Sequence, residues 1–302
     1  MPNLAITIAG LKLKKPLILA SGIFGETGES LLRVANAGAG AVVTKSITLK
    51  PIEGYKNPTF VELEHGLLNA IGLANPGIEE YSKELKVALK GNVPVIGSIA
   101  GKSTKEFNQL ATKMEEFGAH AIELNLSCPH AKGYGMEICE DLELVVKIIR
   151  NVKSSVKIPV FAKIPAYANL QKVGKVIENA GADAIVAINS VKAMKIDLDT
   201  RMPILSNKVG GYSGKVIKPI GVRCVYELAS TINIPVIGCG GILSGEDVIE
   251  YLMAGATAVQ IGSAVYYRNI EVFKKIEKEL KYWMEKNNYR KVEELIGLAL
   301  RK

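Results

Sequence analysis

Eight short apolar segments of two kinds, which alternate strictly along the chain, constrain this sequence more than any other feature. Four segments begin with a proline that leads into β-branched residues, at Pro16, Pro94, Pro159 and Pro235. The other four follow a glycine that ends a helical stretch, at Gly38, Gly118, Gly181 and Gly255. Continuous apolar runs of this length are typical of parallel strands buried on both faces, so the sequence predicts eight such strands.

Segments with helical periodicity separate these strands and predict helices at 105–117, 142–152, 169–180, 245–254 and 270–285. Eight strand–helix units within 302 residues favour an α/β fold of the (β/α)8 TIM barrel type. A doubly wound sheet is the alternative, but its first strand leads into a GxGxxG turn that this chain lacks. No linker divides the chain, so residues 1–302 are expected to form a single domain.

Three segments lie outside the repeat. Residues 4–15 predict a short N-terminal hairpin that closes the bottom of the barrel. Residues 46–76 and 190–217 are rich in Gly, Pro and Asn, and they form long loops after the second and sixth strands. Loops that follow barrel strands gather at the mouth where active sites lie, so both loops are expected to be functional.

The composition disfavours nucleic-acid, membrane and metal partners. The formal charge is +8, but Lys alternates with Glu in the most basic stretch, residues 273–291, as on a solvated helix face. No apolar run reaches the roughly 20 residues of a membrane span, and the N-terminus does not resemble a secretory signal. The four cysteines have no zinc spacing and the three histidines are scattered. We therefore expect a reduced, cytoplasmic protein without a metal site.

Small, amide or cationic residues follow the strands at the predicted mouth. Gly240-Gly241 and Gly262-Ser263 follow the seventh and eighth strands, where barrels commonly bind phosphate through bare backbone N–H groups. Tight turns are the alternative reading of these glycines. The pairing of the two loops favours a phosphorylated ligand.

Cys128 follows the fourth strand and precedes a Gly-rich stretch. A thiolate there could act as a nucleophile or as a general base if nearby cations lowered its pKa. The other cysteines, Cys139, Cys224 and Cys239, are expected to be structural because buried cysteine usually acts as a small apolar group.

Two lysines and four asparagines complete the predicted mouth. Lys45 and Lys163 end apolar strands, and either could neutralise an anionic substrate or a reduced cofactor. The amides offer donors and acceptors that suit an imide or amide ring, or they could stabilise loops. They are Asn69, Asn75, Asn125 and Asn189.

Taken together, these motifs resemble the FMN-containing catalytic subunit of dihydroorotate dehydrogenase over nearly the whole chain. The matching elements are Ala20-Ser21-Gly22, Lys45-Ser46, Asn69-AIGLANPG, Asn125-LSCP, Lys163, Asn189-Ser190, residues 196–221, GCGGI and IGSA. Residues 196–221 and the Asn69 motif look most like the NAD-linked class 1B enzymes. That resemblance implies FMN as cofactor and a partner subunit that carries FAD and an iron–sulfur cluster, in a heterotetramer built on a homodimer.

The resemblance also implies a role for each matching residue. Cys128 would be the catalytic base, assisted by Lys45. The groups that would bind the pyrimidine are Lys45, Asn69, Gly72, Leu73, Asn125, His130, Asn189 and Ser190. The groups that would bind FMN are Ala20, Ser21, Gly22, Lys45, Ser46, Asn125, Lys163, Gly214, Gly240, Gly241, Gly262 and Ser263.

The implied reaction is the oxidation of dihydroorotate to orotate in pyrimidine biosynthesis. Cys128 would remove the proton from carbon 5 while a hydride passes from carbon 6 to FMN. This chain departs from the family at His130, where Asn is usual, and its loop CPHAKGYGM is similar to that of dihydropyrimidine dehydrogenase. Oxidation or reduction of uracil-type rings is therefore the alternative. A phosphosugar barrel enzyme without flavin and a non-catalytic barrel are further alternatives.

Overall fold

The computed structural model describes residues 1–127, 140–167 and 169–301. Eight parallel strands close into a barrel in the order β10-β15-β16-β3-β4-β7-β8-β9. Their bounds are β3 Leu17–Leu19, β4 Ala41–Val43, β7 Val95–Ile99, β8 Ala121–Asn125, β9 Val160–Ile164, β10 Ala184–Ala187, β15 Val236–Cys239 and β16 Ala256–Ile261. The predicted TIM barrel is confirmed, with one barrel strand in each of the eight predicted segments.

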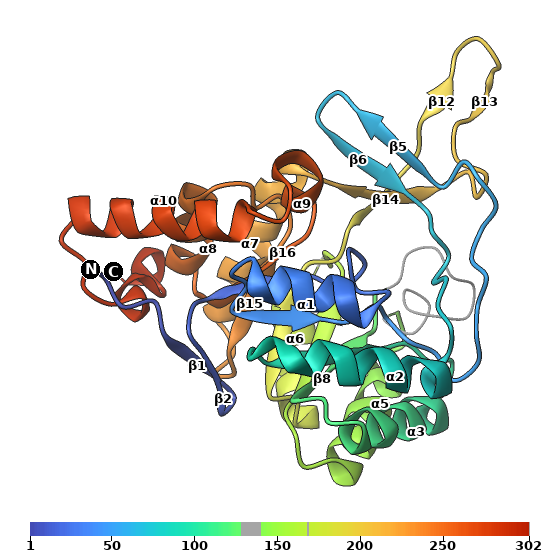
Figure 1. The fold of residues 1–302 in the computed structure, drawn as a ribbon, viewed down its shortest axis with the longest axis horizontal. Helices are drawn as coiled ribbons and strands as arrows, with labels where there is room; N and C mark the ends of the chain where they lie inside the picture. Colours follow the sequence, from blue (N-terminus) through green and yellow to red (C-terminus); the bar gives the residue numbers. More distant parts are fainter. Residues whose placement is uncertain (128–139, 168, 302) are drawn as a thin grey trace.

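Helices surround the barrel, and their buried faces pack against it (Figure 1). Their bounds are α1 Gly28–Asn36, α2 Ile78–Ala88, α3 Thr104–Glu116, α5 Leu142–Ser155, α6 Leu170–Ala180, α7 Lys218–Ala229, α8 Gly245–Met253, α9 Ala264–Arg268 and α10 Val272–Lys286. Short 3₁₀ turns occur at Leu89–Gly91, Lys215–Ile217, Val292–Leu295 and Leu298–Leu300. The five predicted helices match α3, α5, α6, α8 and α10 to within three residues at each end.

The glycines that mark the second kind of segment have the predicted left-handed backbone. Their φ angles are +105° at Gly38, +98° at Gly118, +95° at Gly181 and +110° at Gly255. L-residues rarely adopt this region, so glycine ends the helix and lets the chain turn directly into the next strand.

The N-terminal hairpin pairs β1, Ile6–Ile8, with β2, Leu11–Leu13. Its two turn residues, Ala9 and Gly10, have φ angles of +49° and +84°, as the tight turn of a two-residue hairpin requires. Ile8 and Leu13 are buried in the main core, which confirms the predicted hairpin.

The two long connections are not independent loops. Residues 46–76 form β5, Phe60–Leu63, and β6, Gly66–Asn69; residues 190–217 form β11, Val191–Ala193, and β14, Gly210–Ser213. These strands join into one sheet in the order β11-β14-β6-β5, and a further hairpin, β12 Ile196–Asp197 with β13 Met202–Pro203, extends beyond it. In Figure 1 this outer sheet projects from the barrel on the side opposite the two chain termini.

Candidate active site

A cavity of about 360 Å³ lies at the carboxyl ends of the barrel strands, and a hollow of about 120 Å³ shares several of its lining residues. This size is within the roughly 300–1,000 Å³ of small-molecule sites. The predicted site residues that line one or both spaces are Ala20, Ser21, Gly22, Lys45, Ser46, Asn69, Gly72, Leu73, Asn125, Lys163, Asn189, Ser190, Gly240, Gly241, Gly262 and Ser263.

Several predicted residues lie elsewhere. Gly214 is not among the residues that line the cavity; its carbonyl oxygen lies 2.8 Å from where a Gly241 Cβ would be. Asn75 is buried and holds its own loop, since its Oδ1 accepts from Gly77 N at 2.9 Å. The predictions on Cys128, His130 and Cys139 fall outside the described residues.

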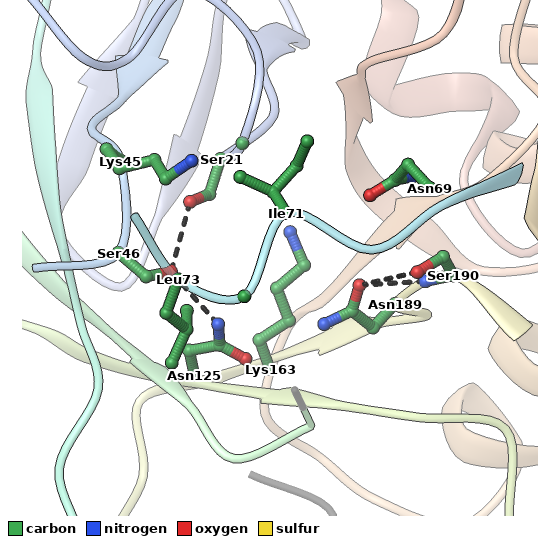
Figure 2. Close-up of a pocket in the computed structure, with 12 residues that line it drawn as sticks. Ser21, Lys45, Ser46, Asn69, Ile71, Leu73, Asn125, Lys163, Asn189 and Ser190 are labelled. Atoms are coloured by element: carbon green, nitrogen blue, oxygen red, sulfur yellow. Dashed lines mark hydrogen bonds between the residues drawn. The ribbon is translucent and has the colours of Figure 1, made fainter. Parts of the chain in front are cut away.

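A chain of neutral hydrogen bonds forms one wall of the site (Figure 2). Asn125 Nδ2 donates to Ser46 Oγ at 2.9 Å, and Ser46 Oγ lies 2.9 Å from Ser98 Oγ and 3.3 Å from Ser21 Oγ. These groups come from four neighbouring strand ends, so the barrel itself fixes their spacing. Each hydroxyl can donate or accept, which allows this wall to match either kind of ligand atom.

Asn189 and Ser190 form the opposite side of the site, with Lys163 between the two sides in Figure 2. Asn189 Nδ2 donates to Ser127 Oγ at 2.9 Å, and Asn189 Oδ1 accepts from Ser190 N at 2.8 Å. Ser127 is the residue before Cys128, so Asn189 fixes the end of the segment that leads to the predicted base. Asn69 lies at the end of β6 and connects this side to the outer sheet through Gly211 O, at 3.4 Å.

Lys163 is 4% exposed and is held inside the barrel. Its Nζ donates to Gln260 Oε1 at 2.8 Å and lies 3.5 Å from Glu123 Oε1. Burial alone would lower the pKa of Lys163, but the charge of Glu123, with a smaller contribution from Cys239, raises it above its ordinary value. Lys163 is therefore a fixed cation beneath the cavity.

Lys45 is 6% exposed and lies just beyond β4. Its Nζ is 3.4 Å from Glu26 Oε1, and the Glu26 side chain is 66% exposed. A partner that lies mostly in water attracts the ammonium only weakly. The positive charge of Lys45 thus remains largely available to an anion in the adjoining hollow.

Two buried polar residues inside otherwise apolar strands, Glu123 and Gln260, were not predicted from the sequence. The signal was present, because Glu123 lies two residues before Asn125 and therefore points to the same interior face of its strand. Fully buried charged residues are rare unless they are paired, so a carboxylate in the segment AIELN should have predicted a buried cation.

The loops after β15 and β16 offer free backbone donors. Gly240 and Gly241 have φ angles of +122° and +67°, and Tyr251 fixes the turn by donating to Gly240 O at 2.7 Å. Within the part of the chain that the structure describes, the N–H groups of Gly240, Gly241 and Ser263 donate to no protein acceptor. Converging unsatisfied N–H groups suit an anion such as phosphate.

The two described cysteines lie in regular secondary structure. Cys224 lies in α7 and Cys239 ends β15. Burial raises the pKa of both thiols. Each is therefore held as a neutral thiol, although Cys239 also lines the cavity.

Comparison with known proteins gives a consistent family. The family model described as dihydroorotate dehydrogenase matches residues 3–284. Proteins named "Dihydroorotate dehydrogenase B (NAD(+)), catalytic subunit" from Methanocaldococcus jannaschii and Pyrococcus abyssi are each 50% identical, over 98% and 99% of both chains respectively. A relative of the same name from Thermoplasma volcanium is 46% identical over 100% of both chains.

A solved structure supports the fold independently. DHODH from Eimeria tenella, in complex with ferulenol, matches with a TM-score of 0.88 at 23% identity, covering 100% of this chain and 90% of that one. The family match and the relatives at 46–50% identity extend over the strands, loops and cavity described above. The chain belongs to the dihydroorotate dehydrogenase family.

Proposed function

We propose that this chain is the FMN-dependent catalytic subunit of an NAD-linked dihydroorotate dehydrogenase, and that it oxidises dihydroorotate to orotate in pyrimidine biosynthesis. The names of the relatives at 46–50% identity support this activity. The observation that carries the proposal is a fixed ammonium, Lys163, beneath a cavity whose other lining residues are uncharged. Such a cation favours a ring system that gains negative charge on reduction.

The residues of the cavity fit FMN. A Cβ at Gly22 would meet no atom within 4 Å, and a Cβ at Gly262 would meet only Ala20 Cβ, at 3.6 Å, so both glycines leave room for a flat ring. The free N–H groups of Gly240, Gly241 and Ser263 would hold its phosphate. Bound there, FMN supplies the electron sink of the reaction. We also propose that residues 1–302 form a single domain and that this domain binds FMN.

The remaining chemistry falls to the chain's own residues. Two C–H bonds of dihydroorotate break: Cys128 would accept the proton from carbon 5, and the hydride from carbon 6 would pass to FMN bound in the cavity. Asn69, Asn125 and Asn189 hold the pyrimidine ring by its polar atoms, together with Gly72, Leu73, His130 and Ser190. Lys45 pairs with the substrate carboxylate, because its partner Glu26 holds it only weakly.

An anaerobic absorbance titration tests the proposal. Purified protein should be yellow, and dihydroorotate should bleach its flavin bands, whereas dihydrouracil should not. The alternative, a dihydropyrimidine dehydrogenase type of enzyme, predicts the reverse preference, and His130 is the residue that favours it. A colourless protein that takes up no FMN would contradict the assignment.

The base is tested by Cys128→Ala, with Cys224→Ala in helix α7 as the matched control. The Cys128 variant should keep its flavin spectrum and lose about 10²–10⁴-fold in turnover near neutral pH, because general-base catalysis is worth that much. The control should keep normal turnover. Full turnover in the Cys128 variant would remove the base assignment.

We further propose that electrons leave through a partner subunit that carries FAD and an iron–sulfur cluster, in a heterotetramer built on a homodimer. The relatives are named "catalytic subunit", which supports a partner. No helix among the described residues is long and apolar enough to cross a bilayer. Co-purification at native expression level tests the proposal; a homo-oligomer fully active with NAD would contradict it.

A further inference from the structure

Glu123 is a buried carboxylate that the proposed reaction does not use. It lies on β8 with 0% exposure and does not line the cavity. One carboxylate oxygen, Oε2, accepts a hydrogen bond from Gln260 Nε2, and within the described residues the other, Oε1, accepts none. Burying a charge in this way is costly unless a partner compensates for it, and the partner here is Lys163, at 3.5 Å.

The three residues form a bridge across the barrel interior. Gln260 on β16 accepts from Lys163 Nζ through its oxygen and donates to Glu123 through its nitrogen, which fixes the orientation of its amide. Lys163 on β9 and Gln260 line the cavity, while Glu123 lies behind them. The ammonium is thus held by one neutral and one charged group from two other strands.

We propose that Glu123 is a positioning residue that acts through Lys163: with Gln260, it keeps the Lys163 ammonium charged and directed at the flavin site. This inference rests on the proposed FMN function. Glu123 does not line the cavity itself, so it acts on the site through Lys163 and through Gln260, which also bonds Lys163.

Electrostatics support this role. Among the described residues, the titratable groups that act on Lys163 are Glu123 on β8 and Cys239 on β15, and burial keeps Cys239 a neutral thiol. Glu123 is therefore the charge that offsets the desolvation of the lysine. Without it, burial can lower the pKa of a lysine by up to about 3–5 units, into the neutral range.

The test compares Glu123→Gln with the wild-type protein, both loaded with FMN and reduced by dithionite. The measured quantity is the ratio of the dissociation constants of oxidised and reduced FMN, followed from about pH 6 to pH 9, the range in which a buried lysine without its counter-charge titrates. Relative to wild type, the preference of the variant for reduced FMN should fall by about tenfold or more across this range, as Lys163 loses its proton. Glu26→Gln, which removes the partner of Lys45, should follow wild type.

Gln260→Leu supplies a second variant if Glu123→Gln does not fold. It removes the amide bridge but keeps the ion pair, so its preference for reduced FMN should fall equally at all pH values. Ratios that match wild type in the folded variants would overturn the positioning role. Dithionite supplies the electrons, so a failure of dihydroorotate to reduce the flavin would contradict the proposed function without affecting this comparison.

Discussion

Lys45 and Lys163 both line the smaller hollow of the site with almost equal burial, yet their counter-charges differ. Lys163 faces a carboxylate with 0% exposure, and Lys45 faces one with 66% side-chain exposure. A buried carboxylate holds an ammonium group strongly, whereas a carboxylate exposed to water attracts it only weakly. The comparison indicates that the Lys163 ammonium is already paired within the protein, whereas the Lys45 ammonium is available to pair with a charged ligand.

The surroundings of the two lysines differ in the same way. Lys45 lies beside a wall of neutral groups, Ser46, Ser98 and Asn125, whose positions depend on hydrogen bonds. Lys163 belongs to a bridge that contains two full charges. Substitutions on the Lys163 side should therefore change stability through charge, and those on the Lys45 side through single hydrogen bonds.

The largest expected effect is the difference in the free energy of unfolding between Lys163→Met and Lys45→Met, both measured in the apoprotein. Removing Lys163 leaves Glu123 buried without a counter-charge, so the free energy of unfolding should fall by about 3–5 kcal/mol. Removing Lys45 leaves an exposed carboxylate, which should cost less than about 1 kcal/mol. Urea unfolding measures both values, and equal losses would break the comparison between the two lysines.

The pH dependence of the Lys163→Met defect sharpens the comparison. Without the ammonium, only the protonated form of Glu123 is stable in the fold, so folding takes up a proton and stability falls as pH rises. The defect should therefore shrink toward about pH 5, by up to about 1.4 kcal/mol per pH unit. In wild type, burial lowers the pKa of Lys163 but the charge of Glu123 outweighs it and leaves this pKa raised, so the ion pair persists until the pH passes above the ordinary pKa of a lysine. Unfolding curves from acid to neutral pH measure this slope. If the stability difference between wild type and Lys163→Met did not change with pH, Glu123 would not be the unpaired group.

The neutral wall should respond to Ser98→Ala. This change removes a fully buried hydroxyl 2.9 Å from Ser46 Oγ, which keeps its hydrogen bonds with Asn125 and Ser21, so the loss of one hydrogen bond should cost about 0.5–1.5 kcal/mol. The backbone bond from Ser98 N to Thr44 Oγ1 is unaffected, so the strand itself should persist. The defect should not depend on pH between about 5 and 8, unlike that of Lys163→Met, because it removes no charge.

The barrel was predictable because its signals are local and repeated. Each strand follows either a proline or a left-handed glycine such as Gly181, and these residues act within a few positions of the chain. The outer sheet was not predictable in this way. Its central pairing joins β6 to β14, with Asn69 bonded to a residue 142 positions away, and the Gly-rich strand of Gly210–Ser213 carries no periodic apolar pattern.

Within the site, sequence reasoning found the residues at the strand ends and missed those below them. Lys163 was visible because it ends an apolar run, but its partners come from two other strands. Their proximity depends on closure of the barrel, since β16 lies far from β9 in the strand order. A buried carboxylate in one segment predicts that a cation is nearby, but no single segment shows which residue supplies that cation.

The smallest expected effect belongs to Glu26→Gln, and it decides whether Lys45 is truly available to a ligand. The pair is mostly in water, so the free energy of unfolding should change by less than about 0.5 kcal/mol. Loss of a competing carboxylate should instead tighten binding of an anionic substrate, seen as a lower KM with kcat nearly unchanged. Glu64→Gln, at another highly exposed carboxylate, is the matched control and should leave both constants unchanged. A KM that rises in Glu26→Gln would mean that Glu26 orients Lys45 for the substrate. Both lysines would then be positioned by a carboxylate, and only the exposure of that carboxylate would differ.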